Sequence, residues 1–291
     1  MGSYPPAPEI LPPDGQPLPE PQPEAPPTVR KPRPGWAVSP ATYSLVGLNL
    51  LVFISMVVHH VSMANPTTDQ LMLWGASHAG AVLQGGEWWR IVSAMFVHVG
   101  IIHLATNMWC LWNLGLLAEP LMGSFGVIAV YVLTGAAGNL LSTAYNWLGP
   151  VFLNRLDPQH FPLVAGFPVG AGASGAVFGI AGALIVLLKS RLLPVPPDDL
   201  KKLRRSVIYF AAINLAIGFT ISFGAAVADA GLRIDNMAHL GGFICGLLFA
   251  LPMVPRIGTP RKLFWSRLRW ALVGVTSLLV LFGFFLAQLP G

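Results

Sequence analysis

The sequence predicts an all-α integral membrane protein with six transmembrane helices in a core bundle and a seventh at the C-terminus. Hydrophobic residues make up 54% of the 291 residues, charged residues make up only 10%, and the mean hydropathy is +0.64. Soluble domains carry about 25% charged residues. The apolar residues are also concentrated in long blocks, most of them close to the roughly 20 residues that a helix needs to cross a bilayer.

The first 40 residues differ in composition from the rest of the chain. They hold fourteen of the 27 prolines and almost no aliphatic run, so they lack the apolar surface that a packed core requires. We predict that residues 1–40 form a disordered, proline-rich cytoplasmic tail, with no apolar segment that resembles a signal peptide. A binding segment for a partner domain that recognises proline motifs is the alternative.

Seven apolar blocks follow the tail, and each is expected to be one membrane-spanning helix. They lie near residues 43–61, 101–118, 125–146, 173–188, 207–227, 237–253 and 270–288. The fourth block is short, which suits a helix that begins below the membrane surface. The chain is therefore expected to divide into the tail, a six-helix core (41–255), and a basic linker with the seventh helix (256–291).

Two long connections, residues 62–100 and 147–172, contain Trp74, Trp88, Trp89 and Trp147. Tryptophan favours the interface between membrane and water. These connections are therefore expected to lie at a membrane surface.

The distribution of lysine and arginine predicts the orientation of the helices. Fourteen of the seventeen basic residues precede the first block or lie in the fourth-to-fifth and sixth-to-seventh connections. The other three, Arg90, Arg155 and Arg233, lie in the alternate connections. Because cytoplasmic loops are enriched in basic residues, we expect a cytoplasmic N-terminus and an external C-terminus, in a multi-pass protein of a bacterial plasma membrane.

Several other classes of function are disfavoured. The net charge of +5 and pI near 9.5 reflect membrane topology, so no nucleic-acid partner is expected. Cys110 and Cys245 lie in apolar blocks and form no CxxC pattern, and HExxH is absent. His98 and His103 lie five residues apart with no carboxylate nearby in sequence. We therefore expect no metal and no cofactor.

Polar side chains in apolar segments suggest a functional site, because such residues are costly in a membrane. Ser174 begins the fourth block, His239 lies near the start of the sixth, and His103 and Asn107 share one face of the second. All three blocks start on the outward side, so these side chains are expected at similar, shallow depth. A serine, a histidine and an asparagine there can supply a nucleophile, a general base and an oxyanion donor.

Glycine spacing suggests how the fourth and sixth helices meet. Gly175 and Gly179 lie four residues apart, as do Gly242 and Gly246, and small residues at this spacing allow close helix approach. Such contact would bring Ser174 toward His239, although ordinary glycine packing explains the spacing equally well.

Asp235 lies four residues before His239. It could orient the histidine as a third catalytic group, but capping of the helix is the favoured role. A Ser–His dyad is therefore expected.

At these residues the sequence resembles the rhomboid family of intramembrane serine proteases. The motif GASG at 172–175 resembles the family's nucleophile motif, and AHLGGFICG at 238–246 resembles the segment around its catalytic histidine. HLATN at 103–107 is similar to the family's HxxxN, and WWR at 88–90 to a Trp–Arg signature of the first external loop. The resemblance covers roughly residues 43–255 and implies the form with six helices plus one.

The resemblance also implies roles for single residues. Ser174 and His239 would be catalytic, and Asn107, His98 and the backbone of Ser174 would form the oxyanion hole. His103, Gly172, Gly175, Gly242, Gly246 and Arg90 would support the site. Phe178 stands where some members have a tyrosine that stacks on the histidine. The implied substrates are membrane proteins with one transmembrane helix, cut near its outer end.

Two other functions remain as alternatives. A rhomboid-like protein without catalysis could bind transmembrane helices, although the intact Ser174 and His239 favour an enzyme. A seven-helix transporter or channel is expected to show inverted repeats and midplane charges, and the sequence shows neither.

Overall fold

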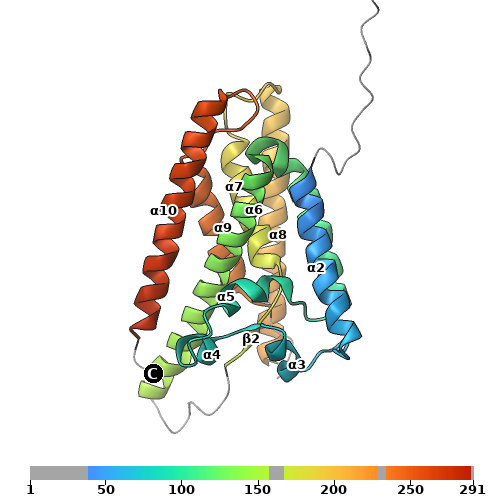
Figure 1. Cartoon of the computed structure of the whole chain (residues 1–291), viewed down its shortest axis with the longest axis vertical. Helices are drawn as coiled ribbons and strands as arrows, with labels where there is room; N and C mark the ends of the chain where they lie inside the picture. Colours follow the sequence, from blue (N-terminus) through green and yellow to red (C-terminus); the bar gives the residue numbers. More distant parts are fainter. Residues whose placement is uncertain (1–38, 157–166, 228–233, 290–291) are drawn as a thin grey trace, which may run out of the picture. The chain divides into compact units, whose positions relative to one another are not determined.

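The computed structural model describes residues 39–156, 167–227 and 234–289, so most of the predicted tail lies outside the described residues. Helices dominate these ranges, and the chain runs back and forth between the two ends of a helical bundle (Figure 1). The passes are made by α2 (Pro40–Val58), the two halves of α6 (Ile101–Leu156), α7 (Ser174–Leu187), α8 (Pro197–Val227), α9 (Asn236–Ala250) and α10 (Arg261–Ala287). The predicted all-α membrane bundle is confirmed.

The first helix, α2, begins with a proline, which suits the first helical turn because proline lacks the N–H that would have no partner there. Ser39 precedes it without capping it through its side chain. The cap comes instead from α6, where the Glu119 carboxylate accepts hydrogen bonds from the backbone nitrogens of Ala41 (2.9 Å) and Thr42 (2.8 Å). The Thr42 hydroxyl donates a third bond at 2.7 Å. This buried carboxylate fixes the start of α2 against α6.

Two predicted membrane passes are joined in α6 by a sharp break. Gly123 has φ 72° and ψ 162°, in a left-handed region that residues with a side chain rarely adopt. The halves on either side correspond to the blocks predicted at 101–118 and 125–146. The second half continues to Leu156, so the expected connection begins about ten residues later than the apolar pattern indicated.

Two other helices are also longer than their apolar blocks. The α8 helix starts at Pro197 and α10 at Arg261, so each includes basic residues that were expected in linkers. Lysine and arginine are good helix formers. Hydropathy marks only the apolar part of a helix, whereas these two helices begin several residues before their apolar segments.

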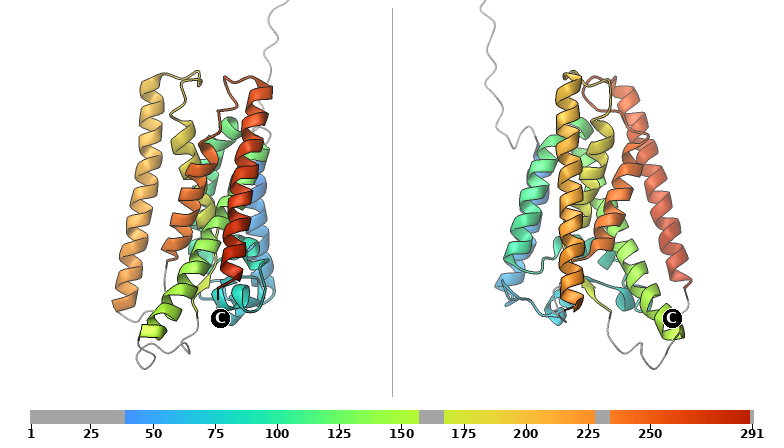
Figure 2. Two further views of the ribbon diagram at one scale, coloured as in Figure 1. Left: turned by 90° about the vertical axis from the view of Figure 1, so that its left-hand side faces the viewer. Right: turned by 180° about the vertical axis from the view of Figure 1, so that it is seen from behind.

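The shortest membrane helices lie at the centre of the bundle, where α7 packs against α6 and α9 (Figure 2). Every residue of α7 from Gly175 to Leu184 is buried. At about 1.5 Å per residue, its 14 residues span about 21 Å of a hydrocarbon layer roughly 30 Å thick. A helix of this length is too short to cross the hydrocarbon layer by itself.

The long first connection forms a compact cap at one end of the bundle (Figure 1). It contains α3 (Thr68–Leu73), β1 (Ser77–His78), α4 (Ala79–Leu83), α5 (Arg90–Ser93) and the short 3-10 helix η1 (Ala94–Phe96). The β1 strand pairs antiparallel with β2 (Val169–Gly170), which matches Ser77 with Gly170. This ladder holds the segment that leads into α7 next to the first connection.

Candidate active site

The predicted polar residues meet in one cavity of about 180 Å³ between α6, α7, α8 and α9. Ser174, His239, His103 and Asn107 all line it. These residues come from three helices that begin at the same end of the bundle. The four predicted side chains therefore lie close together at one end of the bundle, as the sequence indicated.

The position of Ser174 depends on the turn that precedes it. Gly172 has φ +130°, and its N–H donates to the Ala94 carbonyl at 2.9 Å. A Cβ on Gly172 would lie 2.5 Å from Cε1 of His103. Only glycine fits there, and the turn delivers Ser174 as the first residue of α7. No side chain caps α7, so its first-turn N–H groups are free to bind an acceptor in the cavity.

The ring of His239 is held by an aromatic stack. Phe178, one turn beyond Ser174, lies 4.4 Å from the imidazole between ring centroids, at an interplanar angle of 14°. Nδ1 of His239 is buried and has no hydrogen-bond partner among the described residues. The stack therefore restricts the orientation of the imidazole ring.

Close contact between α7 and α9 brings the two chemical groups together. An added Cβ on Gly242 would overlap the carbonyl oxygen of Gly175, and one on Gly246 would overlap that of Gly179. Both predicted glycine pairs are therefore in backbone contact, as their spacing indicated.

Asn107 and His103 lie one turn apart on α6. Nδ2 of Asn107 donates one hydrogen bond to the His103 carbonyl at 2.9 Å. A carboxamide nitrogen carries two hydrogens, so one N–H remains for a group in the cavity.

His98 lies behind His103, with 5.4 Å between the ring centroids, and does not line the cavity. Burial, together with His103, lowers the pKa of His98 to about 3, so the ring is neutral at physiological pH. Its Nδ1 lies 3.2 Å from the Phe96 carbonyl, and a carbonyl can only accept, so Nδ1 carries the proton. Nε2 is then a bare acceptor without a partner among the described residues. A role for His98 as an oxyanion donor stays a prediction, and it would require the other tautomer of the ring because an acceptor nitrogen cannot donate to an oxyanion.

Asp235 caps α9, the role that the sequence favoured. One carboxylate oxygen accepts from the Ala238 N–H at 2.9 Å, and the other accepts from the Ser142 hydroxyl at 2.5 Å. Both oxygens are thus engaged away from the imidazole of His239. The described residues contain no cluster of three His, Cys, Asp or Glu side chains that could hold a metal ion.

Comparison with known protein families matches residues 85–256 to the Rhomboid domain. The chain belongs to the rhomboid family. This assignment confirms the resemblance in the four motifs, and it makes the chain a multi-pass membrane protein of that family. The match begins in the first connection and ends just after α9, so it covers the elements that build the cavity.

Individual relatives agree with the family match. The chain is 30% identical to rhomboid protease GluP of Bacillus subtilis over 219 residues, which are 75% of this chain and 36% of GluP. It is 29% identical to rhomboid protease AarA of Providencia stuartii over 213 residues, 73% of this chain and 72% of AarA. RHOMBOID-like protein 6, mitochondrial, of Arabidopsis thaliana is 31% identical over 66% of this chain and 53% of its own length. The chain thus spans about a third of GluP and half of the plant relative.

Arg90, which was predicted to support the site, lies in the first connection and does not line the cavity. Its guanidinium is buried in the first connection, where it donates to the carbonyls of Met72 (2.7 Å) and Ala76 (3.0 Å) and pairs with Glu87. It also lies over the Trp89 ring at 4.5 Å. Arg90 thereby fixes the connection whose Ala94 carbonyl holds Gly172.

Sequence reasoning missed several residues of the site. Cys110, Phe210 and Asn214 also line the cavity, and α8 contributes the last two. Sequence reasoning also missed the buried carboxylate of Glu119, which lies within α6 and is 2% exposed. Its carboxylate is tolerated because Ala41, Thr42 and Ser124 donate hydrogen bonds to it. The position of Glu119 directly after an apolar block was the sequence signal that could have indicated a buried, hydrogen-bonded carboxylate.

Proposed function

We propose that this rhomboid is an intramembrane serine endopeptidase in which Ser174 is the nucleophile and His239 is the general base. One observation carries the proposal. Ser174 and His239 line the same cavity, on helices in backbone contact, and Phe178 stacks on the imidazole. The names of GluP and AarA as rhomboid proteases support it. A protein that only bound helices would need neither group.

The reaction follows from the chemistry of a Ser–His dyad. The Ser174 oxygen attacks the scissile carbonyl while His239 takes the hydroxyl proton. Collapse of the tetrahedral intermediate breaks the peptide C–N bond, and His239 returns the proton to the leaving amine. A water molecule then loses a proton to His239 and attacks the carbonyl of the acyl-enzyme. The ester C–O bond to Ser174 breaks, His239 returns its proton to the serine oxygen, and the new carboxyl group leaves.

The oxyanion of the intermediate needs donors in the same cavity. We assign the backbone N–H of Ser174, at the uncapped start of α7, and the remaining Nδ2–H of Asn107. The partial positive charge at a helix N-terminus adds to this stabilisation.

Substrates are proposed to be membrane proteins with a single transmembrane helix. The depth of Ser174 favours cleavage near the end of that helix on the same side, where local unwinding frees the scissile carbonyl. The clustering of basic residues at the other end of the passes supports a cytoplasmic N-terminus and an external site. A bacterial plasma membrane remains part of the same proposal.

The test combines active-site labelling with cleavage of a model single-span substrate. The unchanged chain should react with a fluorophosphonate probe and cut the substrate in detergent. Ser174→Ala should lose both signals, and His239→Ala should lose cleavage. Because a catalytic pair acts as a unit, the double variant should be no slower than either single variant. Ser277→Ala, an exposed serine of α10, is the matched control and should keep both signals.

Folding of each variant is checked by its melting temperature. A correctly folded Ser174→Ala that still cuts the substrate would refute the dyad. An unchanged chain that melts cooperatively yet neither labels nor cuts would favour the helix-binding alternative.

A further inference from the structure

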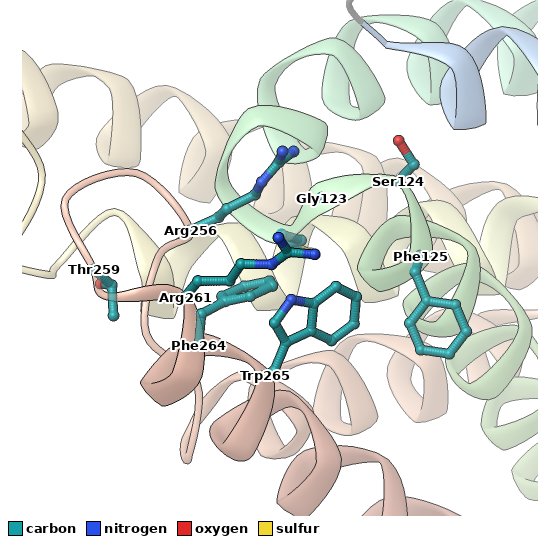
Figure 3. Close-up of a pocket in the computed structure, with 9 residues that line it drawn as sticks. Gly123, Ser124, Phe125, Arg256, Thr259, Arg261, Phe264 and Trp265 are labelled. Carbon is teal, nitrogen blue, oxygen red and sulfur yellow. The ribbon is translucent and has the colours of Figure 1, made fainter.

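A second cavity, of about 550 Å³, lies where α6 bends at Gly123 and α10 begins at Arg261. This is the end of the bundle at which α7 finishes, away from Ser174 (Figure 1). Its size is within the roughly 300–1,000 Å³ of typical ligand sites. Its wall includes two arginines, a buried threonine hydroxyl and three aromatic rings (Figure 3).

Arg256 and Arg261 bring two positive charges to the cavity wall. The guanidinium groups of Arg256 and Arg261 extend toward the turn at Gly123 (Figure 3). Neither forms an ion pair with any residue that the structure describes. None of the described residues that line the cavity carries a carboxylate. The carboxylate that Ser124 contacts, Glu119, already accepts hydrogen bonds from the start of α2.

Backbone polarity adds to this positive charge. The second half of α6 starts directly after Gly123, and α10 starts at Arg261, so two helix N-termini border the cavity. No side chain caps α10. Helix N-termini attract anions through their free N–H groups and partial positive charge. The Thr259 hydroxyl oxygen is buried without a hydrogen-bond partner among the described residues, so it offers a further polar contact.

The rim of the cavity is aromatic and exposed. The Trp265 and Phe125 rings lie 6.3 Å apart and are 39% and 53% exposed. Tryptophan favours the membrane interface. A small soluble anion would satisfy the arginines but leave these rings uncovered, whereas a phospholipid covers them with its acyl chains.

We propose that this cavity binds the phosphate headgroup of an anionic phospholipid. Arg256 and Arg261 hold the phosphate oxygens, and the acyl chains lie along Phe125 and Trp265. Basic pockets between helices on the cytoplasmic side of membrane proteins bind such headgroups. The lipid would join α6 to α10 and would thereby stabilise the docking of the seventh helix.

The experiment measures the melting temperature of the full chain in a neutral detergent while lipid is added. Phosphatidylglycerol should raise the melting temperature in a saturable manner, and phosphatidylcholine should raise it much less. Arg256→Gln combined with Arg261→Gln should weaken the response to phosphatidylglycerol at least tenfold in concentration. Arg267→Gln combined with Arg269→Gln removes the same charge from exposed positions of α10 that do not line the cavity, and this variant should respond like the unchanged chain.

Three outcomes would overturn the proposal. Equal responses of the two double variants would show that phosphatidylglycerol acts through general charge. A full response to inorganic phosphate alone, at the concentrations effective for the lipid, would identify a soluble anion as the ligand. The third test uses the unchanged chain, so it does not depend on the folding of a variant. A photoactivatable phosphatidylglycerol should label residues 122–125 or 256–265, and labelling confined to other segments would refute the site.

Discussion

Replacement of Gly242 by alanine tests the contact on which the candidate active site depends. The new methyl group would overlap the backbone carbonyl of Gly175, which directly follows Ser174. Ordinary Cβ contacts begin at 3.4 Å, and a backbone carbonyl inside a packed helix cannot rotate away. The helices α7 and α9 must therefore separate, and Ser174 must move relative to His239.

The magnitude follows from two opposing terms. Alanine stabilises a helix interior by about 1 kcal/mol relative to glycine, whereas overpacking of a close contact costs about 1–3 kcal/mol. Gly47 lies inside α2 with nothing within 4 Å of an added Cβ, so Gly47→Ala measures the first term alone. We expect Gly242→Ala to be less stable than Gly47→Ala by about 1–3 kcal/mol. This difference corresponds to a melting temperature lower by roughly 2–4 °C per kcal/mol.

Catalysis should respond more strongly than stability. A shift of about 1 Å between catalytic groups can reduce the rate about 10²-fold. Gly246→Ala creates a similar overlap one turn farther along, at Gly179. It should lose comparable stability but less activity, because the strain lies farther from Ser174.

The assay is a melting curve in detergent beside cleavage of a single-span substrate for each of the three variants. A Gly242→Ala variant that matches Gly47→Ala in both measurements would refute the backbone contact. Equal rate losses in Gly242→Ala and Gly246→Ala would show that activity follows bundle stability rather than local alignment.

Two further predictions concern single side chains. Removal of one oxyanion donor reduces the rate about 10²–10³-fold. The Asn107→Ala variant should therefore cleave the substrate slowly, while its Ser174 still reacts with the fluorophosphonate probe. Cleavage at the native rate would show that Asn107 is a packing residue. Glu119→Ala should lower the free energy of unfolding by about 2–4 kcal/mol, because it removes the cap of α2 and leaves buried donors unpaired. Glu119→Gln, which keeps some of these bonds, should lose less in the same melting curves, and equal losses would argue against the hydrogen bonds.

Some features were predictable because they depend on local composition. Hydropathy marked the apolar segment of each membrane pass. The positions of most lysines and arginines indicated which ends of these passes lie on the same side. Motif spacing also put Ser174, His239 and Asn107 on helices that start at the same end, and the cavity is where these side chains meet. Depth along a helix is countable from sequence because each residue adds a fixed rise.

Helix limits were predictable only in part. The apolar pattern missed the first residues of α8 and α10 because lysine and arginine continue a helix beyond the hydrocarbon. The apolar pattern also predicted two separate passes at 101–118 and 125–146. It did not show that helix continues on both sides of a single break at Gly123.

Tertiary structure alone decided which groups are partners. Glu119 caps a helix that lies 77 residues away in sequence, and Asp235 reaches Ser142 on α6 rather than the imidazole that follows it in sequence. Phe210 and Asn214 reach the cavity because of where α8 packs. The joint position of Arg256 and Arg261 beside Gly123 likewise arises from the meeting of α6 and α10. Composition and periodicity describe neighbours along one helix, whereas hydrogen bonds and cavities depend on which faces of different helices come into contact.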